Sequence, residues 1–201
     1  AEAEGIDFDL ERRGILHIYH DAASFDAARR SNALLQAGGL ERFAVSGSEA
    51  RNIEPTLQTD CYGGFYTPSD ATGDIHKFTS GLARACERLG VTFVQDADIE
   101  QISREGRPYA MDVLREGGTV REQHETDAIV ICAGAVSRKF ARQMGDSLNI
   151  YPVKGYSISV HLDEPDSRAA APTVSLLDEA AKIVTSRLGD RFRVAGTCLL
   201  Y

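Results

Sequence analysis

Residues 182–200 read KIVTSRLGDRFRVAGTCLL, two alternating runs on either side of Leu188-Gly189-Asp190. The second run repeats apolar or small residues at every other position, the period of a β-strand: Phe192, Val194, Gly196, Cys198 and Leu200. Two such runs joined by a short Gly-containing segment are typical of a β-hairpin. The segment therefore predicts antiparallel sheet in the last third of the chain.

The segments before this hairpin extend the same pattern. Residues 151–162 (YPVKGYSISVHL) alternate, with four apolar side chains on one face: Tyr156, Ile158, Val160 and Leu162. Gly14–His20 and Gly63–Thr67 also predict strands. Between them, Asp21 is the expected N-cap of a helix through Gln36, and the Ser46/Glu49 spacing predicts a capping box for a short helix.

The centre of the chain differs in character. Asp74 is the expected cap of a helix that Gly90 ends, with an apolar stripe at helical spacing: Ile75, Phe78, Leu82, Cys86 and Leu89. Val91–Val94 predicts a strand directly after it. Short antiparallel strands are expected at Ile99–Ser103, Met111–Arg115 and Val120–Glu125, with turns at Gly106 and Gly117-Gly118, and a helix at Ala135–Met144. The apolar run Asp127–Cys132 predicts a strand buried on both faces, with Ile129–Cys132 away from any exposed edge.

Together these patterns predict an α+β fold of two discontinuous parts. Residues 1–68 and 148–201 form one domain, built on antiparallel sheet with helices. Residues 69–147 form part of a second domain with α/β character. The chain ends in the apolar Leu199-Leu200-Tyr201, which suggests a piece of a longer protein.

Composition excludes several functions. A formal net charge of -8 disfavours a nucleic-acid surface, which needs clustered Lys and Arg. No apolar run approaches the roughly 20 residues of a membrane span, and the acidic residues 1–5 lead us to expect no signal peptide. The five histidines are scattered and His17 and His20 are expected on opposite strand faces, so no metal site is expected. The four cysteines are Cys61, Cys86, Cys132 and Cys198. Three of them lie in apolar patterns, which predict buried thiols.

Four segments in register carry a resemblance to a known family. They are GDIHKFTSGLARACERLGVTFVQDADI (73–99), DAIVICAGAVS (127–137), YPVKGYSISV (151–160) and LLDEAAKIVTSRLGDRFRVAGT (176–197). In this order the chain resembles the D-amino-acid oxidase superfamily of FAD-dependent oxidoreductases, and within it the bacterial D-amino-acid dehydrogenases. The resemblance assigns residues 69–147 to a partial FAD-binding domain and the flanking segments to a substrate domain.

The resemblance also implies a chemistry. A hydride passes from the carbon that bears the amine to FAD, and the imino acid hydrolyses to a 2-oxo acid and ammonia. The expected partners are a small amino-acid substrate and a respiratory or dye electron acceptor. The expected location is cytoplasmic, with peripheral attachment at the inner membrane in the full-length protein.

Individual positions follow from the same resemblance. The Ala133-Gly134 turn is expected to pack its backbone against the nucleotide end of FAD, and the alternative is a plain strand-to-helix turn. Ile99 stands where family members offer backbone groups to the adenine, or is an ordinary core residue. Lys154 and Tyr156, on either side of Gly155, are expected to line the substrate cavity, although core packing suits Tyr156 equally.

Other candidates are interpreted as structural. Arg187 is expected to form a structural ion pair rather than a carboxylate clamp. His76, in the first turn of a helix, has no expected catalytic role. Ser137 and Ser157 lack a base in a triad pattern, so nucleophilic hydrolysis is not indicated.

The departures from the family limit what this chain is expected to do alone. No G-x-G-x-x-G occurs in it, and the family's substrate-clamping arginine lies beyond its last residue. We expect the isolated chain to be an inactive internal fragment of an enzyme. The alternatives are a fragment of a glycine-, sarcosine- or hydroxyproline-type amine oxidase, and a non-catalytic binding domain.

Overall fold

The computed structural model describes residues 1–103 and 108–200, and only the backbone of residues 197–200. It divides into two compact units. The first comprises Ala1–Arg88 and Gly155–Cys198, and the second comprises Leu89–Lys154 with the residues from Leu199. The predicted turn at Gly106 lies outside the described residues. Each unit is taken separately below.

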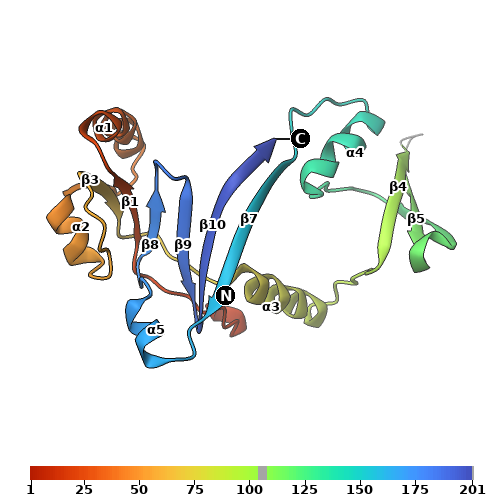
Figure 1. The fold of residues 1–201 in the computed structure, drawn as a ribbon. Helices are drawn as coiled ribbons and strands as arrows, with labels where there is room; N and C mark the ends of the chain where they lie inside the picture. Colours follow the sequence, from red (N-terminus) through yellow and green to blue (C-terminus); the bar gives the residue numbers. More distant parts are fainter. Residues whose placement is uncertain (104–107, 201) are drawn as a thin grey trace. The chain divides into compact units, whose positions relative to one another are not determined.

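A seven-stranded sheet in the order β2-β3-β1-β8-β9-β10-β7 runs through the first unit (Figure 1). Its strands are β1 (Ile15–Tyr19), β2 (Phe43–Ser46), β3 (Gly63–Thr67), β7 (Val153–His161), β8 (Ser175–Asp178), β9 (Ile183–Leu188) and β10 (Arg191–Leu200). The predicted hairpin is confirmed: Leu188 pairs with Arg191, and Gly189 takes the left-handed φ of +61° that the turn requires.

The sheet is mixed rather than wholly antiparallel, which corrects the prediction. β1 pairs with β8 in parallel, Ile15 opposite Ser175 and Leu16 opposite Leu176. These strands are far apart in the chain, and only the folded topology reveals their pairing. The sequence predicts neither β8 nor the helix α5 (Pro165–Ala170) before it.

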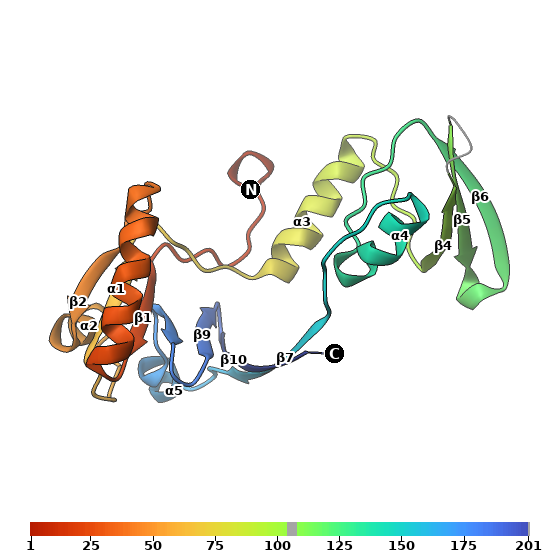
Figure 2. The same cartoon turned by 90° about the horizontal axis from the view of Figure 1, so that it is seen from above.

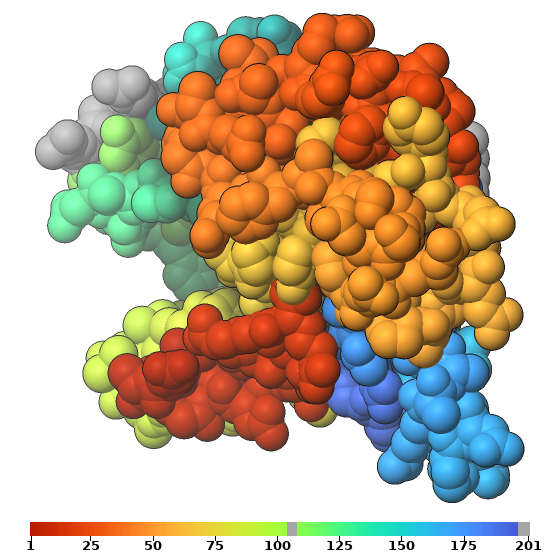
Figure 3. All heavy atoms as spheres, turned by 90° about the vertical axis from the view of Figure 1, so that its left-hand side faces the viewer, coloured from red at the N-terminus to blue at the C-terminus, as the bar shows by residue number. Residues whose placement is uncertain are grey.

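The other helices of this unit begin as their caps predict. They are α1 (Ala22–Ala37), α2 (Gly47–Ile53) and α3 (Ile75–Arg88), with a 3-10 turn, η1, at Glu2–Glu4. The Asp21 side chain accepts a hydrogen bond from Ser24 N, and Ser46 with Glu49 forms both bonds of the capping box. In the space-filling view, the orange side chains of α1 and α2 form a continuous outer surface (Figure 3).

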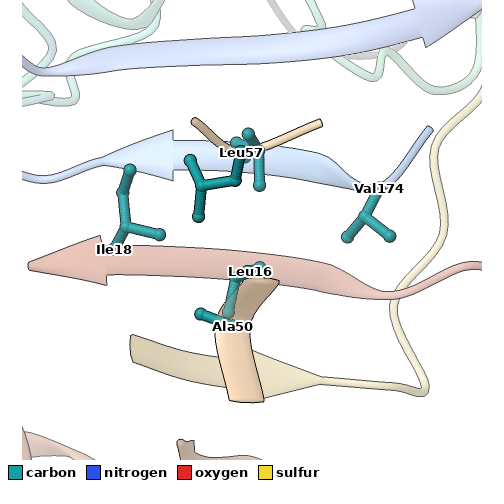
Figure 4. Close-up of a cluster of buried hydrophobic side chains, with 6 residues drawn as sticks. Leu16, Ile18, Ala50, Leu57 and Val174 are labelled. Atoms are coloured by element: carbon teal, nitrogen blue, oxygen red, sulfur yellow. The ribbon is translucent and has the colours of Figure 1, made fainter. Parts of the chain in front are cut away.

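α1 and α2 cover opposite faces of the sheet. Leu16 and Ile18 point to α2 and pack in the main core with Ala50, Leu57, Val174 and Leu176 (Figure 4). Phe65 lies opposite His17 on the other face, where its ring stacks on Phe25 of α1 with centroids 5.0 Å apart. Together β1 and β3 therefore supply apolar side chains to both layers.

One carboxylate is buried beside this core. Glu54 is 1% exposed and accepts hydrogen bonds from the backbone N–H groups of Thr173 (2.7 Å) and Val174 (2.8 Å). Burial alone would raise the pKa of Glu54, but these bonds and those from Thr56 outweigh it and hold the pKa below its usual value. Glu54 thus joins the end of α2 to the segment that enters β8.

α3 packs on the N-terminal segment through small residues. Gly81 and Ala85 are buried, and Phe78 meets Phe8 edge-on with centroids 5.2 Å apart. A Cβ on Gly81 would lie 2.4 Å from Ile6 Cγ2, so any larger residue would force the Ile6 side chain to move. Three members of the predicted apolar stripe are instead exposed, which corrects that prediction: Ile75 at 65%, Leu82 at 43% and Leu89 at 79%.

A three-stranded antiparallel sheet with one helix makes up the second unit. Its strands are β4 (Ala97–Ser103), β5 (Tyr109–Arg115) and β6 (Val120–Thr126), and its helix is α4 (Ser137–Gln143), with 3-10 turns η2 (Glu116–Gly118) and η3 (Gly134–Val136). Figure 2 shows α4 beside β4. Gln143 accepts from Ile102 N and donates to Glu100 O, which joins α4 to the edge of β4.

Two predicted strands are absent here. Neither Val91–Val94 nor Asp127–Cys132 is in a strand, and Val130 is 86% exposed. A strand is stable only when neighbours satisfy its backbone groups, and among the described residues nothing pairs with either run. The prediction of a buried Ile129–Cys132 strand is therefore wrong for this structure. Of the predicted buried thiols, Cys61 and Cys86 are half-buried and Cys132 is exposed.

Candidate functional site

The strand register shows which residues share the face of the large sheet that α1 covers. His17 lies opposite Leu177, Leu177 opposite Val184, and Val184 opposite Ala195. The face that α1 covers at β1 therefore continues over β9 and β10. There Val184, Leu188 and Ala195 lie among polar side chains in the wall of a cavity.

This polar sheet face is formed by Ser186 and Arg193, with Ser157 and Ser159 of β7. The Arg193 guanidinium donates to Ser157 Oγ at 3.1 Å. Phe192 and Val194 point the other way by alternation. The period-two pattern of residues 192–200 predicts that apolar face. Arg191 and Arg193, which alternate with Phe192 and Val194, indicate the polar face opposite.

A cavity of about 440 Å³ lies over the polar sheet face and is closed at one side by Thr72–His76. Asp74 caps α3 by accepting from His76 N (2.9 Å) and Lys77 N (3.1 Å), and it pairs with Arg191 at the start of β10. The Lys77 backbone bond, reinforced by Arg191, holds the pKa of Asp74 below its usual value. The carboxylate therefore fixes the helix start against the hairpin, and His76 lines the cavity beside it.

Tyr156 lines a neighbouring cavity of about 300 Å³. Its lining includes Gly155, Lys182, Arg193 and Gly196. Tyr156 is 50% exposed and belongs to the first unit, whereas Lys154 belongs to the second unit and is not among the lining residues. The structure thus places one of the two predicted substrate-lining residues at a cavity of the sheet.

The three predicted cofactor residues lie in the second unit, around α4. Ile99 is 37% exposed on β4, and its carbonyl accepts from Lys139 Nζ at 3.4 Å. Ala133 N donates to Ser137 Oγ at 3.0 Å. Gly134 has a φ of +54°, and a Cβ on it would meet nothing within 4 Å. The turn needs glycine for its backbone conformation and leaves open space beside it.

Arg187 differs from its prediction. Its guanidinium donates to the backbone carbonyl of Arg168 at 3.2 Å, and no carboxylate of the described residues lies within ion-pair distance. The predicted ion pair is wrong because the end of α5, which the sequence did not indicate, provides a carbonyl there.

The turn between β8 and β9 carries two histidine–carboxylate pairs that the sequence analysis missed. His17 Nδ1 lies 2.9 Å from Glu179 Oε1, and His20 Nε2 lies 2.9 Å from Asp178 Oδ2. Lys182 Nζ reaches the other oxygen of Glu179 at 2.9 Å. The pairs tie this turn to the end of β1, and Lys182 has a left-handed φ of +54°.

Among the described residues, no group of three or more His, Cys, Asp or Glu side chains is arranged to hold a metal ion. No helix within the described ranges is long and apolar enough to cross a membrane.

Comparison with known proteins gives the geometry a context. Over 198 residues the chain is 52% identical to D-amino acid dehydrogenase 3 of Mesorhizobium japonicum, covering 98% of this chain and 47% of that protein. It is 41% identical over 196 residues to D-amino acid dehydrogenase of Paramagnetospirillum magneticum, covering 96% and 44%. The chain therefore spans about half the length of these curated relatives.

Solved structures share the fold. Glycine oxidase from Geobacillus kaustophilus superposes with a TM-score of 0.82 at 22% identity, over 99% of this chain and 51% of that one. L-proline dehydrogenase from P. horikoshii gives a TM-score of 0.76 at 15% identity, over 98% and 52%. A family model described as FAD dependent oxidoreductase matches residues 1–201. The chain belongs to this family of FAD-dependent oxidoreductases.

Proposed function

We propose that this chain is part of an FAD-dependent D-amino-acid dehydrogenase that converts D-amino acids to 2-oxo acids and ammonia. The observation that carries the proposal is the 52% identity to D-amino acid dehydrogenase 3 of Mesorhizobium japonicum across 98% of this chain. The proposal covers the full-length protein, with a respiratory electron acceptor at the inner face of the membrane. The isolated chain, which has no G-x-G-x-x-G, is inactive.

The second unit is the proposed contribution to the FAD-binding domain. FAD, when bound, supplies the hydride acceptor. The Ala133-Gly134 turn fits close approach of a nucleotide, because a Cβ on Gly134 would meet no protein atom within 4 Å. Ile99 offers its backbone from the edge strand β4, where its carbonyl accepts from Lys139 of α4. In this proposal the partial FAD-binding domain is residues 69–147, which include α3 of the first unit and end before residues 148–154 of the second.

The large sheet is the proposed contribution to the substrate domain, from residues 1–68 and 148–201. Its polar sheet face presents Arg193 and three serine hydroxyls to a cavity, which suits a small polar molecule. Tyr156 lines the neighbouring cavity and would cover the substrate there, with Lys154 at the start of the same strand. These side chains position an amino acid and leave the oxidation to the cofactor.

Turnover by the full-length protein tests this proposal. The FAD-loaded enzyme is assayed with a dye acceptor against D-alanine, D-leucine, their L-enantiomers, glycine and sarcosine. Faster turnover of the D-amino acids supports the proposal. Preference for glycine or sarcosine would assign a glycine-oxidase-type activity, and absence of both flavin and turnover would assign a binding domain.

The cofactor turn has its own test in the full-length protein. Gly134→Val places a branched side chain at the proposed nucleotide contact, and Gly145→Val is the matched control, since Gly145 also has a positive φ (+85°) with nothing within 4 Å. A side chain that overpacks against a ligand costs about 1–3 kcal/mol. We therefore expect roughly ten- to hundred-fold weaker FAD binding for Gly134→Val and no such loss for Gly145→Val. Equal flavin occupancy of the two variants, measured by absorbance, would contradict this placement. Arg187→Ala is expected to retain FAD.

A further inference from the structure

The cavity of about 300 Å³ that Tyr156 lines, here called the Tyr156 cavity, has charges of one sign only. Two of its lining residues, Lys182 and Arg193, are cations, and none of the described residues that line it is Asp or Glu. The others are small, apolar or hydroxyl-bearing: Gly155, Tyr156, Ser157, Val184, Ala195 and Gly196. The Tyr156 cavity therefore favours an anionic group over a cationic one.

Arg193 is the cation that a molecule in the cavity can reach directly. Its side chain is exposed, and its guanidinium donates to Ser157 Oγ at 3.1 Å. No carboxylate of the described residues lies within ion-pair distance of it. The bond to Ser157 orients the planar guanidinium and uses one of its five N–H donors, so several donors face the cavity without an acid to neutralise them.

Lys182 supplies a second cation, whose backbone is fixed while its ammonium can move. Asp178 Oδ1 accepts from the backbone N–H groups of Ala180 and Ala181 at 2.9 Å, which holds the turn before β9 in place. Lys182 Nζ lies 2.9 Å from Glu179 Oε2, but the lysine side chain is 73% exposed, so this pair contributes little. The ammonium can therefore turn from Glu179 toward a bound anion.

The Tyr156 cavity continues into the cavity of about 440 Å³, because the two share four lining residues: Ser157, Val184, Arg193 and Ala195. The larger cavity contains an acid as well as cations, since Asp74 pairs with Arg191 in its wall. The ammonium of an amino acid, if placed in the Tyr156 cavity, would face two cations and no acid. The Tyr156 cavity therefore suits a carboxylate that is separated from the ammonium by a side chain.

We propose that Arg193 and Lys182 select D-amino acids whose side chains end in a carboxylate, the class of D-aspartate and D-glutamate. The side-chain carboxylate accepts from the Arg193 guanidinium and pairs with the Lys182 ammonium. Val184 and Ala195 lie beneath the methylene groups of the substrate, where both cavities meet. This inference rests on the proposed function, because it assigns a substrate class to the dehydrogenase reaction.

The test compares D-glutamate with D-glutamine, which has the same shape without the charge, in the full-length FAD-loaded enzyme with a dye acceptor. We expect kcat/KM for D-glutamate to exceed that for D-glutamine by about tenfold or more, because hydrogen bonds to charged groups are the stronger ones. The difference should lie mainly in KM. It should shrink as the salt concentration rises, because Arg193 and Lys182 are exposed.

Variants assign the preference to the two cations. Arg193→Met should lower kcat/KM for D-glutamate at least about tenfold more than that for D-glutamine, and Lys182→Met should have a smaller effect of the same kind. Arg193→Lys keeps the charge and should retain most of the preference. Arg30→Met, at an exposed position of α1 outside both cavities, is the matched control and should behave like the parent enzyme.

The outcomes separate this inference from the proposed function. Equal turnover of D-glutamate and D-glutamine by the parent enzyme would overturn the inference alone. Equal losses for both substrates in Arg193→Met would also overturn it, because Arg193 would then act on a group that both substrates share or on the fold. Turnover of no D-amino acid at all would overturn the proposed function, and this inference with it.

Discussion

The two units of the molecule each use one side chain to join a helix to the backbone of a strand, but in opposite surroundings. Glu54 is 1% exposed and receives two backbone N–H groups at the entry to β8. Gln143 is exposed and spans the edge of β4 through Ile102 N and Glu100 O. The side chain that joins helix to strand is therefore charged and buried in the first unit, and neutral and solvent-exposed in the second.

The cores differ in the same way. The first unit closes a cluster around Leu16, which is fully buried. The second unit buries Ile102, Val113 and Phe140 but leaves a larger apolar group in solvent: Val91, Phe93, Val94, Ile99, Val120 and Val130. Apolar side chains that stay in solvent contribute no burial free energy to folding. We therefore expect the first unit to be the more stable of the two.

The largest effect is expected from Glu54→Ala. It would leave the N–H groups of Thr173 and Val174 buried without an acceptor, at a cost of about 1–3 kcal/mol each. The free energy of unfolding of the first unit should fall by about 2–5 kcal/mol, measured by urea denaturation and hydrogen exchange. Glu41→Ala, at an exposed site, is the control and should change it by less than about 0.5 kcal/mol.

Gln143→Ala should have a smaller and more local effect. Solvent can replace both lost bonds, so the expected cost is about 0.5–1.5 kcal/mol. Hydrogen exchange should accelerate at Ile102 while protection in β1 and β8 is unchanged. If exchange in β1 accelerated equally, the two units would unfold together and the comparison would be broken.

The pH dependence of the first unit sharpens the comparison further. The bond to Asp178 raises the pKa of His20 above 6.5, so its stabilisation is complete below that pH and is lost as the pH rises through the raised value. Burial alone would raise the pKa of Asp178, but hydrogen bonds from Ala181 and His20 lower it. The Asp178 contribution is present above pH 3.8 and is lost as the pH falls through the lowered value.

The free energy of unfolding of the first unit should therefore fall by up to about 1 kcal/mol between about pH 6 and about pH 8. A partly exposed ion pair contributes about that much. His20→Gln should flatten this part of the profile. His161→Gln, at an exposed position of β7, is the control and should leave it unchanged. A His20 NMR titration with a midpoint below 6.5 would contradict the assignment.

The smallest effect in the isolated chain is expected from Val130→Asp. Val130 is 86% exposed, so the change should alter the unfolding free energy by less than about 0.5 kcal/mol. Urea denaturation measures this change, and a loss of more than about 1 kcal/mol would contradict the exposed position of Val130.

Local signals explain which elements the sequence predicts. The caps at Asp21, Ser46 and Asp74, and the turn at Gly189, act within a few residues, so the elements they bound are readable. The parallel β1–β8 pair depends on residues far apart in the chain, and no local pattern encodes it. Val91–Val94 and Asp127–Cys132 have strand composition without a neighbouring strand, so composition alone misplaces them.

The candidate site was readable only in part, for a related reason. Tyr156 and Gly155 stood out because they lie in a family motif, and the structure places both at a cavity. Arg193 and Ser157 meet across two strands, and a single strand shows only half of that pair.

The parallel pairing of β1 with β8 has a consequence for synthesis on the ribosome. β1 emerges about 160 residues before the strand beside it, and translation proceeds at about 5–20 residues per second. For roughly 8–32 seconds the growing chain therefore displays one edge of β1, and for the later part of that interval β3, paired with β2, already covers the other edge. During that interval the exposed edge can pair with another nascent chain, so chaperone occupancy of this segment should fall sharply once Ser175–Asp178 has left the exit tunnel.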